Sequence, residues 1–340
     1  MKRRTATRAP LAALLAIVGL LALSASAPAV HYPIGQTAWG PQEECLSGAP
    51  HEVLQTSLNP NLSGSYVVPP GGGAITSWSI LAGEATGQIA GLKVFRPVAP
   101  NTYLVVGEDS PRPLAPSILN TFSAAVPVQA GDVIGLAIPA GSPVPCRFKA
   151  SFGDQVGLIG GDNPVGATVA PTSFASESRV NVSATVLPPP VTNSVLPEKG
   201  SFRGGTRVSV FGGNFDRILG VSFGSTPALG FEVSNETGLV AVAPPGAFRS
   251  TVPITVTTVA GSATLEGAFT YAGCRVPRLL GDKLKPAKKR ARKASCRVGR
   301  VKKLDGATAK TGRVVKQRPK PGKLLSPGAK INISLAPQRG

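Results

Sequence analysis

The residues best placed to do chemistry are lysines and arginines gathered near the C-terminus. Residues 274–340 hold 21 of them against two aspartates, a net charge of +19 that equals the charge of the whole chain. Such a surface attracts polyanions, although the same residues could serve only to solubilise a small domain. The strongest candidates for polyanion contact lie in two clusters: Lys288, Lys289, Arg290, Arg292, Lys293, Lys302 and Lys303.

Binding through this stretch should depend on charge alone. No Phe, Tyr or Trp follows Tyr271, so stacking on sugar rings or nucleobases is not available there. Contacts should therefore weaken with salt, because the Debye length is about 8 Å at physiological ionic strength.

Residues suited to catalysis are scarce. The two histidines, His31 and His51, lie near the N-terminus and suggest no catalytic triad, and no phosphate-binding loop or HExxH motif occurs. The acidic pairs Glu43-Glu44 and Glu108-Asp109 read as solvated turn residues, although a glycosidase with two carboxylates across a cleft remains an alternative. We predict no catalytic residue, no metal site and no cofactor.

The four cysteines indicate disulfides in an oxidising compartment. They allow three pairings, of which the simplest keeps each bridge within one module. That choice joins Cys45 to Cys146 and Cys274 to Cys296.

The N-terminus has the pattern of a secretory signal peptide over residues 1–27. Basic residues precede the apolar run Leu11–Leu23, and Ala25-Ser26-Ala27 supplies a cleavage motif. Thirteen apolar residues are fewer than the roughly 20 needed to span a bilayer. We expect cleavage after Ala27, and a secreted mature chain without an integral membrane segment.

Residues 28–187 are predicted to form a β-sandwich module. Short apolar or alternating runs recur between Gly/Pro turns, which is typical of sandwiches and jelly rolls. Val126–Pro139 resembles a hairpin of jelly-roll domains in secreted and carbohydrate-binding proteins. Trp78 lies in an alternating run and is predicted to pack in the core, with sugar stacking as the alternative. The predicted runs are 51–58, 64–68, 74–82, 88–96, 102–106, 118–128, 132–139, 146–152 and 178–186.

A proline linker at 188–190 favours an extended spacer before residues 191–271. The motif series there is Pro197, Gly200, Gly204-Gly205-Thr206, Val208–Phe215, Val221–Gly224, Ala243-Pro244-Pro245, Val252–Thr257, Gly261 and Phe269-Thr270-Tyr271. It resembles an IPT/TIG domain, which implies an immunoglobulin-like sandwich. Some relatives contact DNA, but this segment has five basic and five acidic residues, which favours a spacer or protein-contact role.

Residues 274–335 resemble a PASTA domain, followed by a tail at 336–340. The motifs are Val276-Pro277, Leu279, Gly281, Ala287, Ala291, Cys296, Gly299, Gly312-Arg313-Val314, Gln317-x-Pro319-x-Pro321-Gly322, Gly328 and Lys330–Leu335. The resemblance implies one short helix on a small three-stranded sheet, and association with the bacterial cell envelope. Independently, Leu284, Ala287, Ala291 and Ala294 share a helical face, and Asp282 is predicted to cap the helix.

The sequence thus predicts a mainly β, multi-domain, non-enzymatic envelope protein. Its basic domain would dock on peptidoglycan or an anionic wall polymer, and the first module would present a site for a carbohydrate or protein ligand. A nucleic-acid-binding protein and a carbohydrate-active enzyme in the first module are the alternatives.

Overall fold

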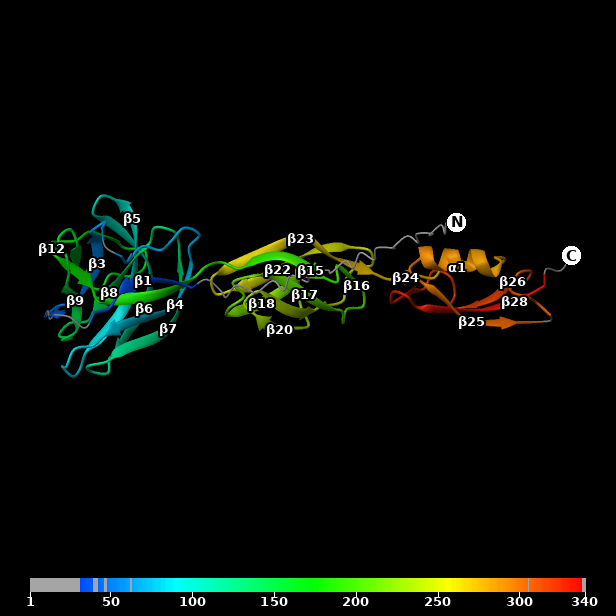
Figure 1. Cartoon of the computed structure of the whole chain (residues 1–340), viewed down its shortest axis with the longest axis horizontal. Helices are drawn as coiled ribbons and strands as arrows, with labels where there is room; N and C mark the ends of the chain where they lie inside the picture. Colours follow the sequence, from blue (N-terminus) through cyan, green and yellow to red (C-terminus); the bar gives the residue numbers. More distant parts are fainter. Residues whose placement is uncertain (1–30, 39–41, 46–47, 62, 305, 338–340) are drawn as a thin grey trace, which may run out of the picture.

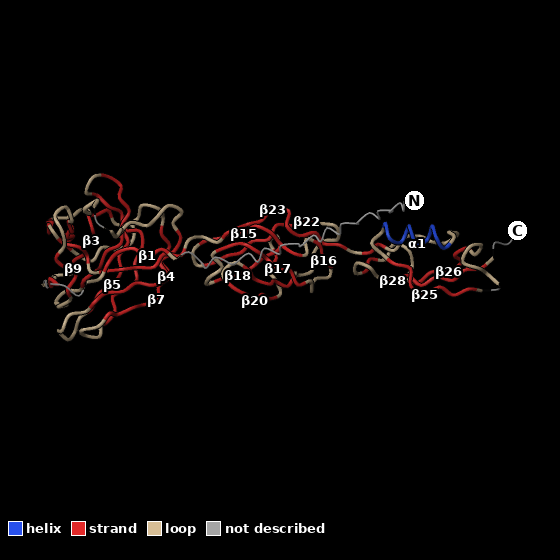
Figure 2. The backbone as a smooth tube through the Cα atoms, viewed as in Figure 1, coloured by secondary structure: helices blue, strands red, loops and turns tan. Residues whose placement is uncertain are grey.

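A computed structural model describes residues 31–38, 42–45, 48–61, 63–304 and 306–337. The predicted signal peptide lies outside these residues. The described chain forms three groups of sheets that follow one another along an elongated molecule (Figure 1). Strands predominate, and the single helix of the described residues lies in the third group (Figure 2). That helix has neither the length nor the apolar content to cross a bilayer.

The first group is a β-sandwich with a smaller third sheet beside it. Its four-stranded sheet has the order β1 (Tyr32–Gln36), β14 (Val182–Leu187), β4 (Gly73–Leu81), β7 (Leu119–Val128). Its seven-stranded sheet has the order β11 (Thr168–Val169), β6 (Thr102–Pro113), β5 (Ile89–Ala99), β8 (Val133–Ile138), β3 (His51–Ser57), β10 (Gln155–Gly160), β12 (Ser173–Ser176). The small sheet has the order β13 (Ser178–Val180), β9 (Pro145–Lys149), β2 (Gln42–Glu44).

The chain crosses repeatedly between the two large sheets, as in a jelly roll. It passes from β3 to β4 in the opposite sheet, returns for β5 and β6, crosses again for β7 and comes back for β8. The predicted hairpin at 126–139 is therefore wrong, because β7 pairs with β4 and β8 pairs with β3 and β5. The predicted turn is present, with Gly131 at φ 89°, but it joins two sheets.

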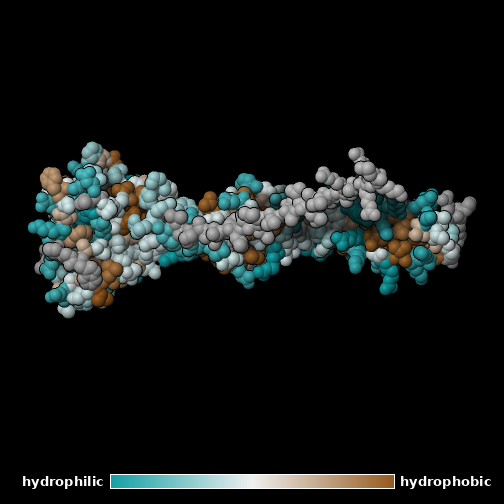
Figure 3. Space-filling view, viewed as in Figure 1, coloured by the Kyte–Doolittle hydropathy of each residue, from teal (hydrophilic) through white to brown (hydrophobic). Residues whose placement is uncertain are grey.

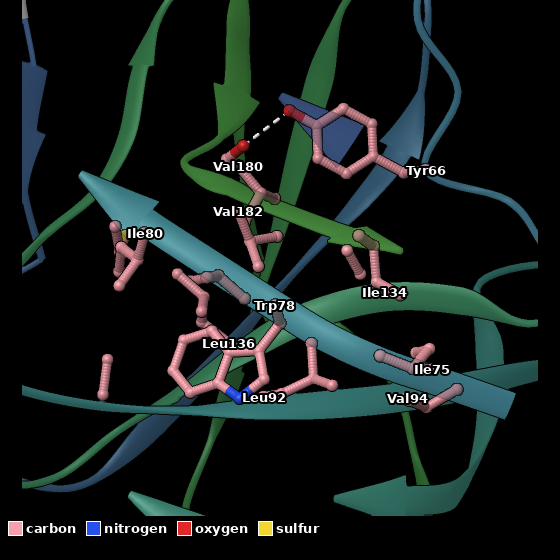
Figure 4. Close-up of a cluster of buried hydrophobic side chains, with 14 of the residues drawn as sticks. Tyr66, Ile75, Trp78, Ile80, Leu92, Val94, Ile134, Leu136, Val180 and Val182 are labelled. Carbon is pink, nitrogen blue, oxygen red and sulfur yellow. Dashed lines mark hydrogen bonds between the residues drawn. The ribbon is translucent and has the colours of Figure 1, made fainter. Parts of the chain in front are cut away.

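Apolar side chains of the two facing sheets fill the core of this sandwich (Figure 4). Trp78 has no exposed surface and packs among Ile80, Leu92 and Leu136. Its indole Nε1 donates a 2.7 Å hydrogen bond to Asp109, which satisfies the buried polar group of a tryptophan. Core packing is confirmed for Trp78, and its burial excludes stacking on a sugar.

One predicted strand, at 64–68, does not form. The segment forms no ladder: it makes an isolated bridge between Val67 and Val133, and the carbonyls of Ser65 and Tyr66 accept single bonds from Gly35 of β1 and Ile134 of β8. Tyr66 is instead buried in the core, where its hydroxyl donates to the carbonyl of Val180 (Figure 4). The apolar pattern of the segment therefore reflects packing of Tyr66 and Val68.

The second group is a sandwich of two sheets. One has the order β15 (Val191–Leu196), β17 (Arg207–Gly213), β21 (Gly238–Val242), β20 (Gly230–Asn235). The other has the order β16 (Lys199–Ser201), β23 (Gly261–Ala272), β22 (Thr251–Thr258), β18 (Ile218–Phe223), β19 (Thr226–Pro227). Aromatic rings dominate its core, where Phe269 packs edge-on against both Phe223 and Tyr271 at centroid distances of 5.2 Å.

Contacts cross the proline linker between the first two groups. Asn214 donates from Nδ2 to the carbonyl of Pro189 at 2.9 Å, and Arg217 donates from Nη1 to the carbonyl of Ala124 at 2.8 Å. Leu187, Ala74 and Ala260 form a small shared apolar cluster. The two sandwiches therefore touch where the linker joins them.

The third group is the small α+β unit that the resemblance implied. Helix α1 (Leu284–Lys293) lies over a sheet of order β25 (Arg297–Lys303), β28 (Lys330–Ala336), β26 (Arg313–Arg318), and β24 (Cys274–Arg275) pairs with β27 (Leu324–Leu325). Ala287 and Ala291 are buried in one apolar cluster with Ile333 of β28. The helix face was predicted correctly. Asp282 does not cap the helix: Lys283 is the N-cap residue without a side-chain bond, and Asp282 pairs with Arg290 at 3.1 Å.

Both disulfides follow the simplest pairing. Cys45 bonds to Cys146 in the first group. Cys274 of β24 bonds to Cys296, which follows α1, and both sulfurs lie in the core of the third group. The second bridge therefore ties the end of the helix to the first strand of the unit.

Removing the second bridge should destabilise the third group alone. For a sequence separation of 22, loop-closure entropy predicts a loss of about 3 kcal/mol for the C274S/C296S variant. Hydrogen exchange of β28 amides measures it, because this group has no aromatic reporter. The C45S/C146S variant is the matched control and should leave β28 protection unchanged. Equal β28 protection in wild type and C274S/C296S would contradict the prediction.

A buried ion pair should make the first sandwich sensitive to acid. Arg179 donates from Nε to Asp154 at 2.8 Å, and both residues are at most 4% exposed. Burial opposes ionisation of Asp154, but the bond and charge of Arg179, together with the backbone amides of Asn59 and Ser151, outweigh it and lower the pKa of the carboxyl below its ordinary 3.8. The stabilisation is therefore present above that value and is lost as pH falls through the lowered pKa.

We expect the Asp154→Asn variant to lose about 3 kcal/mol of unfolding free energy at neutral pH, because the guanidinium stays buried without its counter-charge. Urea unfolding followed by tryptophan fluorescence measures this loss. The variant should also lose less stability than wild type between about pH 5 and pH 3. Glu43→Gln, which removes the more exposed partner of Arg147, should cost under about 1 kcal/mol. Similar costs for the two variants would refute the prediction.

Candidate polyanion-binding site

The third group concentrates positive charge around a single carboxylate. Its described residues, 274–304 and 306–337, include 20 lysines and arginines, and Asp282 is the one acidic residue among them. Asp282 is already occupied by Arg290, which also donates from Nη1 to the carbonyl of Arg278 at 3.0 Å. Hydrophilic side chains project from both margins of this end of the molecule in Figure 3. Arg313 donates from Nη1 to the carbonyl of Gly281 at 2.8 Å. The lysines and arginines of the described residues thus far outnumber the carboxylates that could neutralise them.

The seven predicted residues do not form one cluster. Five lie on α1, and Lys302 and Lys303 lie at the end of β25. Lys302 pairs in register with Ser334 of β28, whose neighbours Ile333 and Leu335 are buried. Since side chains alternate across a strand, Lys302 belongs to the face of the sheet opposite the core and α1. Lys303 pairs with the buried Leu335 and so belongs to the core and helix side, which leaves Lys302 as the one member of the predicted set on the sheet side.

A groove on the helix side brings two of the predicted residues together. Lys288 and Arg292 of α1 line a cavity of about 690 Å³ with Arg297 of β25. Its other lining residues are Ser295, Cys296, Val298 and Gly328. The amide of Gly328 donates to the carbonyl of Ser295 at 2.7 Å, which joins the turn before β28 to the end of the helix. Lys289 and Lys293 do not line this groove.

A second groove lies on the sheet side, where four cations converge. Lys302 is joined by three residues that were not predicted, Arg300, Lys316 and Arg318, around a cavity of about 360 Å³. These residues come from two strands with β28 between them. A signal for them exists in the sequence, because Arg300 and Lys302, like Lys316 and Arg318, are two residues apart and so share a strand face.

Several carboxylates of the first group are engaged in ion pairs. Lys93 is 2% exposed, and its Nζ lies 2.5 Å from Glu108, 3.5 Å from Glu52 and 3.2 Å from Asp162. Burial raises the pKa of Glu52, an effect that Asn163 and Lys93 partly offset. Burial would lower the pKa of Lys93, but Glu108 and the other carboxylates outweigh it and raise the pKa. The ion pairs of Lys93 in β5 with Glu52 in β3 and Glu108 in β6 thus link these three strands.

Two of the other predicted acidic residues, Asp109 and Glu43, also have partners. Asp109 accepts from Arg112 at 2.8 Å and from the indole of Trp78. Glu43 accepts from Arg147 at 2.6 Å, whereas Glu44 is exposed at the end of β2. These bonds bind the acidic residues to the sandwich itself.

The first sandwich also has a shallow, largely apolar groove. Its volume is about 510 Å³, and Val106, Pro127 and Val165 are among the residues that line it. Arg96 at its margin is held by Asp132 through a 2.7 Å bond. The lining contains no aromatic side chain.

Comparison with known proteins identifies the second and third groups. An IPT/TIG domain model matches residues 190–271, and a PASTA domain model matches residues 275–337. Protein MGA2 of Saccharomyces cerevisiae is 32% identical over 110 residues, which is 32% of this chain and 9% of that protein. An ankyrin and IPT/TIG repeat-containing protein of Schizosaccharomyces pombe is 34% identical over 82 residues, 24% of this chain and 7% of that protein. The chain thus spans less than a tenth of either relative.

A solved structure described as SGBP-B from a complex xyloglucan utilization locus in Bacteroides uniformis also matches. It covers 60% of this chain and 47% of its own, at 18% identity and a TM-score of 0.23, a similarity too low to bear on fold or function. The domain matches agree with the motifs and with the sheets described above. The chain therefore carries an IPT/TIG domain at residues 190–271, followed by a PASTA domain at residues 275–337.

Proposed function

We propose that this protein is an exported, non-enzymatic binding protein of the bacterial cell envelope. Its basic PASTA domain docks it on peptidoglycan or on an anionic wall polymer. The main observation behind the proposal is the imbalance of charge in the PASTA domain. Its residues 274–304 and 306–337 include 20 lysines and arginines but one carboxylate. Such a surface draws polyanions from solution and holds them through many weak contacts.

Two features support an extracellular location. The described chain contains two disulfides, which form and persist mainly in oxidising compartments. The PASTA match points the same way, because domains of this family are associated with the cell envelope. Export through the predicted signal peptide at 1–27 completes this part of the proposal.

The first sandwich is the module presented away from the docking end. It lies at the opposite end of the molecule from the PASTA domain, with the IPT/TIG domain between them (Figure 1). We assign it a carbohydrate or protein ligand. The IPT/TIG domain serves as the spacer, because residues 191–271 carry no net charge with which to hold a polyanion.

A role in binding a wall polymer fits the side chains of this protein better than a glycosidase or a nucleic-acid-binding role. The carboxylates that a glycosidase would need, such as Glu108 and Asp109, are held by Lys93 and Arg112. A nucleic-acid-binding role lacks aromatic side chains in the basic domain for base stacking.

The PASTA domain should be required for binding to purified cell-wall sacculi. We expect a chain lacking residues 274–340 to bind at least about 10-fold more weakly than the full chain in a pelleting assay, because it loses the net positive charge. About 0.5 M salt should release the full chain, since the Debye length falls toward 3 Å near 1 M. Sacculi stripped of anionic polymers separate the two ligands: retained binding identifies peptidoglycan, and lost binding identifies the polymer. Equal pelleting of the truncated and full chains would refute docking through the PASTA domain.

The full chain should release no soluble glycan from the same sacculi. Released reducing sugars measure cleavage, and a hydrolase of known activity is the positive control. Sugar release that rises with protein concentration and disappears in Glu108→Gln would instead assign a glycosidase to the first sandwich.

A further inference from the structure

The solvent face of the PASTA sheet carries an ordered array of cations. On the central strand β28, Ile331, Ile333 and Leu335 are buried in the core. The side chains between them, Asn332 and Ser334, therefore lie on the opposite face. They line the sheet-side groove of about 360 Å³.

The register of the strands arranges these residues in two rows. In the first row, Lys302 of β25 and Lys316 of β26 both pair with Ser334. In the second row, Arg318 pairs with Asn332, and the amide of Arg300 donates to Asn332 Oδ1 at 2.8 Å. Each row thus has one cation on either side of a central polar residue.

The groove offers hydrogen-bond donors almost exclusively. Lysine and arginine side chains only donate. The Asn332 side-chain oxygen is occupied by the Arg300 amide, which leaves its Nδ2 to donate, and the Ser334 hydroxyl can also donate. Within the described part of the chain, no carboxylate pairs with any of the four cations. A ligand that complements this lining should present oxygens that only accept hydrogen bonds. Phosphate oxygens meet this requirement, because they form short, charge-assisted hydrogen bonds with lysine and arginine.

The spacing of the rows suits a repeating anion. Ser334 and Asn332 are two residues apart on one strand, so the rows lie about 7 Å from each other. Successive phosphates joined by one glycerol unit are separated on a similar scale. We propose that this groove binds a linear polyol-phosphate polymer, with one phosphodiester in each row. The inference rests on the proposed function and specifies its ligand and its contact face.

The groove favours such a polymer over two other sources of phosphate. A recess along β28, flanked by cations of β25 and β26, receives a single flexible chain, whereas a bilayer presents a flat layer of headgroups. Nucleic acid would leave its bases without stacking partners, because the domain contains no aromatic side chain. Vesicles and an oligonucleotide therefore serve as competing probes.

The test uses the full chain and a fluorescent oligomer of about six glycerol phosphate units, with anisotropy as the readout at low salt. The variants K302Q/K316Q and R300Q/R318Q each remove one row. We expect each to weaken binding about 10-fold or more, because charge-assisted bonds are lost. The matched control K289Q/K293Q removes the same charge from α1 outside both grooves and should weaken binding less than about 3-fold. Unchanged hydrogen exchange of β28 shows that the variants remain folded.

Several outcomes would overturn the inference. An equal loss in K289Q/K293Q would indicate attraction by net charge without a site. A selective loss in K288Q/R292Q would move the site to the helix-side groove. Tighter, row-dependent binding of phosphatidylglycerol vesicles or of a six-nucleotide single strand would replace the polymer with that ligand.

Failure of this inference can be told apart from failure of the proposed function. If wild type pellets with sacculi but does not bind the oligomer, envelope docking stands and the polyol-phosphate assignment fails. If wild type binds neither, both fail.

Discussion

Mutual repulsion among like charges is the constraint that the PASTA domain must overcome to fold. Twenty lysines and arginines of its described residues surround a small core that includes Ala287, Ala291 and Ile333, and self-repulsion destabilises a compact state. The buried Cys274–Cys296 bridge offsets this by restricting the unfolded chain. A bound polyanion would do so by neutralising the surface, and any ligand selective for the folded state stabilises it. Stability and ligand binding are therefore linked in this domain.

The junctions between domains determine how that charge is presented. A single residue, Gly273, separates β23 from β24, and a Cβ there would lie 2.7 Å from the ring of Phe202. Arg203 also donates from Nη2 to the carbonyl of Leu324 at 3.2 Å across this junction. The close packing at Gly273 joins the second and third groups, and the contacts around Pro189 join the first and second. Both favour an extended arrangement over modules that tumble independently.

The sequence was informative where one pattern had one physical cause. Alternating apolar runs predicted β3, β4 and β5, and the separation of the cysteines into modules predicted both bridges. The sequence-based prediction failed where one residue pattern is compatible with two different structures. The apolar segment around Tyr66 packs in the core without pairing as a strand, and Asp282 found a cation in place of a helix N–H. The sheet-side cations were missed because strand register, which local composition does not encode, brings them together.

The three domains differ in charge in an order that suits the proposed docking. Residues 28–190 contain six basic and ten acidic residues, residues 191–271 are neutral, and residues 274–340 carry +19. An anionic wall would therefore attract one end of the molecule and repel the other. The neutral sandwich between them is longer than the Debye length of about 8 Å, because its 12-residue strand β23 runs along the molecule (Figure 1) and spans about 40 Å. The end domains would then act as separate charges, and on the proposed wall ligand their order would orient the first sandwich away from the wall.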